Sequence, residues 1–445
     1  MTAADLVIHA RWVIPVEPDS RIYDHHAVAV RDGRIFAILP SAEARARFRP
    51  VETVELPGHV LIPGFVNAHT HAAMTLLRGL ADDLPLMPWL KEHIWPTESR
   101  WVSAEFVRDG SELAMAGMLH SGTTCFNDMY FFPETTAEAV RRCGMRAYLG
   151  MIVVNFPSAW GDGPRDYIAK GTALRDHYKD DPLLSFTFAP HAPYSVAESW
   201  LEEIRTLADE LDVPVQTHLH ETAAEIQQSL DQYGKRPLAR LAGLGWLTPN
   251  FMAVHMTQLD DAEIGELARG GVHVVHCPES NLKLASGFCP VAKLLAAGVN
   301  VALGTDGAAS NNDLDMLAEM RCAALLAKGV SGDATLLPAA TALRMATLNG
   351  ARALGLERDI GSLLPGKWAD MTALDLRTPE CQPVYNPLSQ LVYAASRQQV
   401  TDVWVAGRRL LNHAELTSLD LDSILERAGR WQQRIAQNAT EATRA

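Results

Sequence analysis

The sequence predicts an α/β fold, a (β/α)8 TIM-like barrel with a small β-sandwich domain formed by both ends of the chain. In the middle of the chain, nearly continuous apolar strand-like segments alternate with longer amphipathic segments. This alternation is typical of a parallel sheet covered by helices on both faces. Short segments rich in β-branched residues and separated by turn residues occupy both ends instead. Eight strand–helix units over roughly 250 residues match the length of such a barrel.

These two sequence patterns define the expected domains. Residues 1–60 and 366–420 form one composite β-domain, because the first segment alone is too small for a stable sheet. Residues 61–365 form the barrel, and residues 421–445 form a C-terminal helix and tail. The eight expected barrel strands are 61–68, 123–128, 146–154, 184–190, 213–219, 251–256, 272–278 and 299–306.

Composition excludes several classes of partner. The formal net charge of −14 should repel phosphate backbones, so we expect no nucleic acid partner. No run of 18 apolar residues appears, so we expect no membrane span. The N-terminus lacks the features of a signal peptide. The six cysteines show no CxxC pairing, which favours reduced thiols and a cytoplasmic location.

Histidines and carboxylates gather where the predicted strands end, which is where barrel enzymes place their chemistry. His69 and His71 end the first strand and face the same side of it, since they are two residues apart. His218 ends the fifth strand and Asp306 the eighth. Three imidazoles and one carboxylate suit a catalytic Zn²⁺ that keeps one position for water. Fe²⁺ or Mn²⁺ would accept the same ligands, but zinc is favoured.

Some of these residues also have an ordinary structural interpretation. Asp306 precedes a glycine and could be an ordinary turn residue. Glu221, three residues after His218, is well placed as an acid–base group beside the metal, although a glutamate is also favoured at a helix start. A structural zinc site is usually closed and rich in cysteine, and no cysteine joins this group. His220 and His276 fit structural roles better.

Longer motifs resemble a known family. The segments PGFVNAHTH, HLHET, AVHMTQ, HCPESNLKLASG and GTDGAASNNDLD are similar to those of the amidohydrolase superfamily, and within it to the 5′-methylthioadenosine/S-adenosylhomocysteine deaminases. The similarity covers nearly the whole chain. It implies hydrolytic deamination of the adenine ring of 5′-methylthioadenosine, S-adenosylhomocysteine or adenosine, which gives the inosine analogue and ammonia.

The resemblance also implies residue roles. His69, His71, His218 and Asp306 would hold one metal ion, because the fourth strand lacks the lysine that bridges two metals in binuclear relatives. Glu221 would protonate the purine ring, His255 would polarise the attacking water, and Asp306 would take its proton. The residues implied to contact the substrate, besides Glu221 and Asp306, are Trp89, Glu98 and His191, with Glu98 binding the ribose hydroxyls.

One segment departs from the family. Relatives that accept S-adenosylhomocysteine carry arginines after the third strand, where this chain has Met151 and only Arg165 as a candidate. Apolar Met151, Val153 and Phe156 suit a methylthio group, so 5′-methylthioadenosine is the expected preference. A homo-oligomer, either dimer or tetramer, is expected by analogy.

Two alternatives keep the barrel but change its use. The same site could act on another amino-substituted heterocycle, such as a guanine-like base, a pterin or a chlorotriazine. A non-enzymatic scaffold would be expected to have lost metal ligands, whereas this chain keeps all of them.

Overall fold

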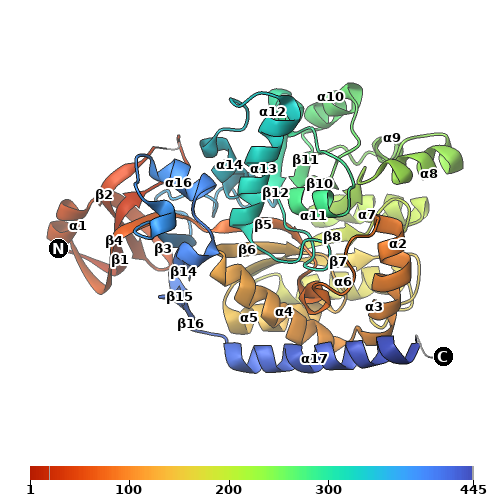
Figure 1. Ribbon diagram of the computed structural model, residues 1–445, viewed down its shortest axis with the longest axis horizontal. Coiled ribbons are helices and arrows are strands. Elements are labelled where there is room, and N and C mark those ends of the chain that lie inside the picture. The colour runs from red at the N-terminus through yellow and green to blue at the C-terminus, as the bar shows by residue number, and fades with distance from the viewer. Residues whose placement is uncertain (20, 443–445) are drawn as a thin grey trace.

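The computed structural model describes residues 1–19 and 21–442 and contains two eight-stranded sheets (Figure 1). One sheet is parallel throughout, with its strands in chain order, and helices surround it. The predicted barrel and the β-domain built from both chain ends are therefore confirmed. The barrel strands are β5 (Phe65–Thr70), β6 (Thr123–Asp128), β7 (Arg146–Val153), β8 (Leu184–Pro190), β9 (Val215–Leu219), β10 (Phe251–His255), β11 (His273–His276) and β12 (Asn300–Leu303).

The last strand meets the first at the site predicted to bind metal. Thr70, at the end of β5, forms a parallel bridge with Asp306, and the Asp306 amide donates to the His69 carbonyl over 3.0 Å. Gly304 permits this approach, since a Cβ there would lie 2.8 Å from the His69 nitrogen. Barrel closure thus joins two predicted ligands directly.

The second sheet combines strands from both chain ends in the order β16-β15-β14-β13-β4-β1-β2-β3. It brings β4 alongside β13, which lies more than 300 positions later in the chain, so the two termini build one domain. Its strands are β1 (Thr2–Val13), β2 (Tyr23–Arg31), β3 (Arg34–Pro40), β4 (Phe48–Pro63), β13 (Met371–Asp375), β14 (Val400–Val405), β15 (Arg408–Asn412) and β16 (Glu415–Leu416).

The predicted strand at 61–68 is divided between the two sheets. Residues 61–63 end β4, and the barrel strand β5 starts at Phe65 after Gly64. A Cβ at Gly64 would lie 2.1 Å from the Thr124 side chain, so only glycine fits where the chain passes from one sheet to the other. The apolar sequence across this junction hides the break.

Helices follow the barrel strands and cover the sheet. The larger ones are α4 (Ala104–His120), α5 (Pro133–Cys143), α6 (Pro164–Tyr178), α7 (Glu198–Leu211), α8 (Ala223–Tyr233), α10 (Asp261–Gly270), α13 (Met316–Ser331) and α17 (Leu421–Ala442). The shorter ones are α1 (Ser41–Arg47), η1 (Ala72–Leu77), α2 (Leu86–Pro88), η2 (Trp89–Ile94), α3 (Trp95–Trp101), α9 (Pro237–Gly243), α11 (Pro278–Lys283), α12 (Val291–Ala296), α14 (Ala339–Met345), α15 (Leu348–Ala353), η3 (Pro379–Cys381), α16 (Pro387–Tyr393) and η4 (Arg397–Gln399).

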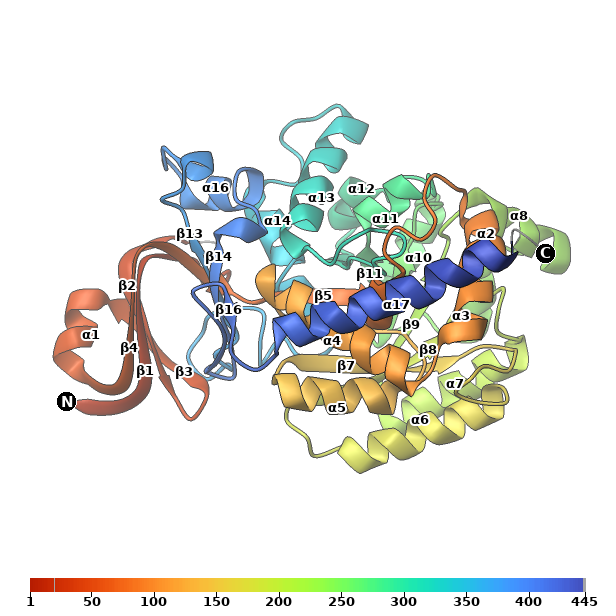
Figure 2. The same cartoon turned by 60° about the horizontal axis from the view of Figure 1, so that its bottom comes forward.

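The C-terminal helix α17 returns from the β-domain and lies across the barrel (Figure 2). Trp431 donates its indole N–H to Asp109 of α4 over 2.9 Å, and Arg427 also contacts that buried carboxylate. This anchoring explains why the predicted helix forms. Residues 443–445 of the expected tail lie outside the described residues.

A buried ion pair joins the barrel to the β-domain. Arg146 of β7 donates its Nε to Asp370 over 2.9 Å, and the Ala406 amide also donates to Asp370 over 2.7 Å. Among the residues described, no helix combines the length and hydropathy needed to span a membrane. All six cysteines are free, as the sequence predicts.

Candidate active site at the ends of the barrel strands

Four predicted ligands meet at the carboxyl ends of β5, β9 and β12. One ligand atom from each of His69, His71, His218 and Asp306 lies within 4.8 Å of all the others. The Nε2 atoms of His69 and His71 are 3.1 and 3.3 Å from that of His218. Asp306 Oδ1 lies 3.1 Å from His71 Nε2. Nitrogen and oxygen atoms that converge in this way form a donor set for a divalent metal.

The opposite ring nitrogens fix the orientation of these imidazoles. Nδ1 of His69 pairs with the Gln216 side-chain oxygen over 3.1 Å. Nδ1 of His71 pairs with the Met129 carbonyl and Nδ1 of His218 with the His191 carbonyl, each over 2.7 Å. Because a carbonyl oxygen can only accept, each Nδ1 carries the proton and each Nε2 lone pair faces the cluster.

Asp306 is held from both sides. Its Oδ2 accepts hydrogen bonds from Ser280 over 2.7 Å and from Ser310 over 3.0 Å, which leaves Oδ1 for the cluster. Burial alone would raise the pKa of Asp306, but its close contacts with the imidazoles of His69 and His71 hold this pKa well below its ordinary value. Its backbone φ of 61° lies in the left-handed region, which aspartate tolerates better than most residues.

Glu221 and His255 lie beside the metal-ligand cluster. Glu221 Oε2 is 3.8 Å from His255 Nε2, and both side chains are buried. Burial and the nearby Asp306 raise the pKa of Glu221 to about 8, so its carboxyl group can hold a proton at neutral pH. Nδ1 of His255 pairs with the Asn281 side-chain oxygen over 2.8 Å. This pair can therefore exchange protons with a bound molecule.

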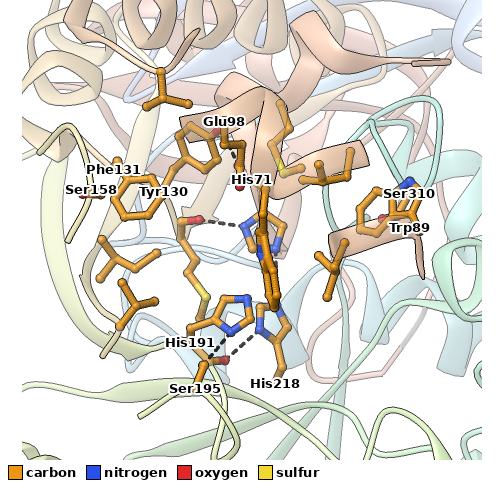
Figure 3. Close-up of a pocket in the computed structure, with 18 of the residues that line it drawn as sticks. His71, Trp89, Glu98, Tyr130, Phe131, Ser158, His191, Ser195, His218 and Ser310 are labelled. Carbon is orange, nitrogen blue, oxygen red and sulfur yellow. Dashed lines mark hydrogen bonds between the residues drawn. The ribbon is translucent and has the colours of Figure 1, made fainter. Parts of the chain in front are cut away.

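A cavity of about 590 Å³ opens above the metal-ligand cluster (Figure 3). Its floor includes His71, His218 and Asp306, and Glu221 and His255 also line it. Such a volume suits a ligand the size of a nucleoside. The remaining wall is mostly apolar, and Glu98 of α3 stands in it with its Oε1 accepting a 2.7 Å hydrogen bond from the Tyr130 hydroxyl.

The structure brings most of the predicted substrate contacts to this cavity. Glu98, Trp89 and His191 all line it. Trp89, at the start of η2, donates its indole N–H to the Ala81 carbonyl over 3.1 Å. Nδ1 of His191 lies 2.9 Å from the Ser195 hydroxyl. His220 points away from the cavity and accepts the Leu238 amide through Nε2, which fits the structural role expected for it.

Two predicted substrate contacts, Met151 and Arg165, are not among the residues that line the cavity. Met151 is fully buried against Gly171 of α6, on the outer side of β7. Alternate residues of a strand face opposite sides, and it is Ile152 and Val154 that line the cavity. Arg165, in the first turn of α6, is exposed and outside the cavity lining.

Several site residues escaped the sequence interpretation. Gln216, Ser280 and Ser310 orient the predicted ligands, and Tyr130 holds Glu98. Ser280 and Ser310 lie within the motifs HCPESNLKLASG and GTDGAASNNDLD, so their position in the sequence could have indicated a role beside the metal ligands. Tyr130 follows the end of β6 in an aromatic run, where a core position is the simpler interpretation.

The chain matches a known protein family over most of its length. The model of the Amidohydrolase family matches residues 60–410. The chain belongs to the amidohydrolase family. This amidohydrolase is 52% identical to a 5-methylthioadenosine/S-adenosylhomocysteine deaminase of Teredinibacter turnerae, with 98% of both chains covered. It is 51% identical to the protein of that name from Saccharophagus degradans, with 99% of both covered.

Solved structures agree with the fold of this amidohydrolase. An adenosine deaminase from Xanthomonas campestris with bound zinc matches with a TM-score of 0.97 and 54% identity, covering 98% of this chain and 99% of that one. An atrazine chlorohydrolase from Arthrobacter aurescens complexed with zinc matches with a TM-score of 0.90 at 22% identity, covering 96% and 100%. The second match shows the fold alone.

Proposed function

We propose that this amidohydrolase is a zinc-dependent deaminase. It hydrolyses the exocyclic amine of the adenine ring in 5′-methylthioadenosine, S-adenosylhomocysteine or adenosine, and releases the inosine analogue and ammonia. One observation carries the proposal: a single cavity joins the metal-ligand cluster, the buried acid Glu221 and the carboxylate Glu98. The deaminase names of relatives about half identical to this chain support it.

The donor set fits a single zinc ion. His69, His71, His218 and Asp306 would hold it, since their ligand atoms converge and hydrogen bonds fix the three imidazole rings. When bound, zinc lowers the pKa of a coordinated water toward 7 and so provides a nucleophile at neutral pH.

Three residues of the chain then orient the attacking water and transfer protons. Glu221, buried at the cavity wall, donates a proton to the ring nitrogen next to the attacked carbon. His255 orients and polarises the attacking water, because Asn281 fixes its ring. Asp306 accepts the proton of that water and passes it to the departing ammonia, while Ser280 and Ser310 hold its second oxygen.

Glu98 supplies the selectivity for nucleosides. A carboxylate that accepts from two vicinal hydroxyls makes charge-assisted hydrogen bonds, and a 2′-deoxy substrate would deprive this half-buried group of one of them. Trp89 and His191 line the same cavity as further substrate contacts. We expect the Glu98→Gln substitution to lower kcat/KM for ribonucleosides while sparing 2′-deoxy analogues. A free base should be indifferent to it.

The cavity favours an uncharged 5′ substituent. Among the described residues that line it, none is lysine or arginine, so the amino-acid carboxylate of S-adenosylhomocysteine would meet no cation there. Ile152, Val154 and Phe156 offer apolar surface in place of the misassigned Met151. We therefore retain 5′-methylthioadenosine as the preferred substrate.

A substrate panel tests this function. Purified protein of known metal content would be offered 5′-methylthioadenosine, S-adenosylhomocysteine, adenosine, adenine and guanine, with loss of the adenine or guanine absorbance followed. We expect rapid turnover of the methylthio compound with one zinc per chain. Activity confined to a free base would refute the nucleoside assignment and favour the alternative, another amino-substituted heterocycle.

Two expectations complete the proposal. We propose a cytoplasmic location, because the six cysteines are free thiols. A dimer or tetramer remains the expected assembly, and light scattering coupled to size-exclusion chromatography measures it directly.

A further inference from the structure

A short segment after β6 contacts two residues that line the cavity, His71 and Glu98. The carbonyl of Met129 accepts the 2.7 Å hydrogen bond from His71 Nδ1, and the next residue, Tyr130, donates its hydroxyl to Glu98 over 2.7 Å. Figure 3 shows the Tyr130–Glu98 pair beside His71. Two consecutive residues therefore hold a metal ligand and the wall carboxylate in a fixed relation.

The segment itself is rigidly attached to the first barrel strand. The carboxyl group of Asp128 accepts the Ala72 amide over 2.7 Å and the Thr70 hydroxyl over 3.2 Å. The Met129 amide donates to the Thr70 carbonyl over 2.9 Å. Since Asp128, Met129 and Tyr130 are all buried, little freedom remains for the Tyr130 ring.

Glu98 is held by a different element. It lies on the seven-residue helix α3, which follows η2 in the connection between β5 and β6. Within the described part of the chain, the hydrogen bond from Tyr130 ties the Glu98 carboxylate to the segment that follows β6. A carboxylate has about four lone-pair sites, so one bond from Tyr130 leaves capacity for a vicinal diol.

From this geometry we infer that Tyr130 is a specificity-determining positioning residue: it sets the distance between the metal centre and the ribose-binding carboxylate Glu98. The inference rests on the proposed function. Tyr130 lines the cavity wall. In this proposal it also determines how strongly the enzyme distinguishes ribonucleosides from deoxynucleosides. Without the Tyr130 hydroxyl, the Glu98 carboxylate can rotate away from the substrate. The ribose hydroxyls then lose a preorganised acceptor.

The test is a cycle of four proteins and two substrates. Wild type, Tyr130→Phe, Glu98→Gln and the double variant would be assayed with 5′-methylthioadenosine and its 2′-deoxy analogue. We expect Tyr130→Phe to lower kcat/KM for the ribonucleoside by about tenfold, mainly through KM, because a hydrogen bond to a charged group is lost. The same substitution should change the 2′-deoxy value by less than about twofold, and should add no further loss to Glu98→Gln.

Tyr148→Phe is the matched control. The Tyr148 hydroxyl is also buried and donates to a backbone acceptor, the Leu354 carbonyl, over 2.6 Å, but it lies outside the cavity. Its removal should leave the ratio of ribo to deoxy activity unchanged. Zinc content and circular dichroism of every variant would verify the fold.

The possible outcomes separate the two proposals. Equal losses on both substrates, an additive loss in the Glu98→Gln background, or a fall in zinc content would show a merely structural Tyr130 and overturn this inference alone. Wild-type protein that turned over no nucleoside, or that ignored the 2′-hydroxyl, would overturn the proposed function or its Glu98 assignment, and the role of Tyr130 with it.

Discussion

At the scale of single residues, the buried environment of Glu221 makes it suitable as a general acid–base group. The group is buried, and Ser286 lies 3.4 Å from its Oε1. We expect Glu221→Gln to lower kcat by roughly 10²- to 10⁴-fold, the usual contribution of a general acid–base group. Steady-state kinetics together with zinc analysis would measure this, since the variant should keep its metal.

An exposed glutamate provides the comparison for Glu221. Glu210→Gln, at the end of α7, changes the same chemical group in solvent and should leave kcat unaltered. If Glu221→Gln retained most of its activity, another group would have to supply the proton to the ring.

The sequence predicted site residues correctly where these residues stand at the end of a predicted strand. His69, His71, His218 and Asp306 lie far apart in sequence but end parallel strands, and such ends meet at one edge of a barrel. It failed for Met151, because assigning the wrong parity within a strand moves a side chain to the opposite face.

At the scale of elements, carboxylates crowd the contact between α11 and α13. The Glu279 amide donates to buried Glu319 over 3.4 Å. Partial burial, with Asp313 and Asp315 nearby, raises the pKa of Glu279 from 4.5 to about 7. Because the folded state holds this proton more tightly than the unfolded state, stability is lost as pH rises from about 4.5 through 7.

Replacement of Glu279 by glutamine removes that pH dependence. We expect Glu279→Gln to raise Tm relative to wild type at pH 8 and to lose this advantage at pH 5, where the wild-type carboxyl group is protonated when folded. Thermal unfolding at the two pH values measures it. A constant difference between the proteins would exclude the assigned ionisation.

The strand order could be predicted because each barrel strand is a continuous apolar run between helices. The division of the predicted strand 61–68 at Gly64 could not be predicted, since apolar residues continue across it. The passage of the chain from one sheet to the other depends on the close contact between Gly64 and Thr124. The return of α17 over α4 also depends on a distant partner, Asp109, which local patterns do not reveal.

At the scale of the whole molecule, Arg146 and Asp370 connect the two domains. Both side chains are nearly inaccessible, so Arg146→Met would leave a carboxylate buried without its partner. We expect a loss of about 3–5 kcal/mol in the free energy of unfolding, measured by chemical denaturation.

The exposed pair of Arg45 and Glu55 serves as the control. Arg45→Met breaks an ion pair of the same kind in solvent, and its cost should stay below about 1 kcal/mol. Similar losses in both variants would argue against a special role for the pair between the domains.

Metal removal should also act on the whole molecule. A ligand that binds only the folded state adds about 4 kcal/mol of stability at a concentration a thousand times its Kd. We therefore expect chelation to abolish turnover and lower Tm together, and one equivalent of zinc per chain to restore both. Recovery of Tm without activity would separate the stabilising metal from the reaction.

The closure of the barrel at His69 and Asp306 also orders events during synthesis. The chain leaves the ribosome from its N-terminus, so the two histidines of the first strand emerge early, His218 later and Asp306 last. Complete coordination must therefore await most of the barrel. When it becomes available, β13–β16 and α17 are still to be made. Until Asp306 has been made, a nascent chain offers zinc only an incomplete histidine cluster, so full loading belongs to a late stage of the protein's synthesis.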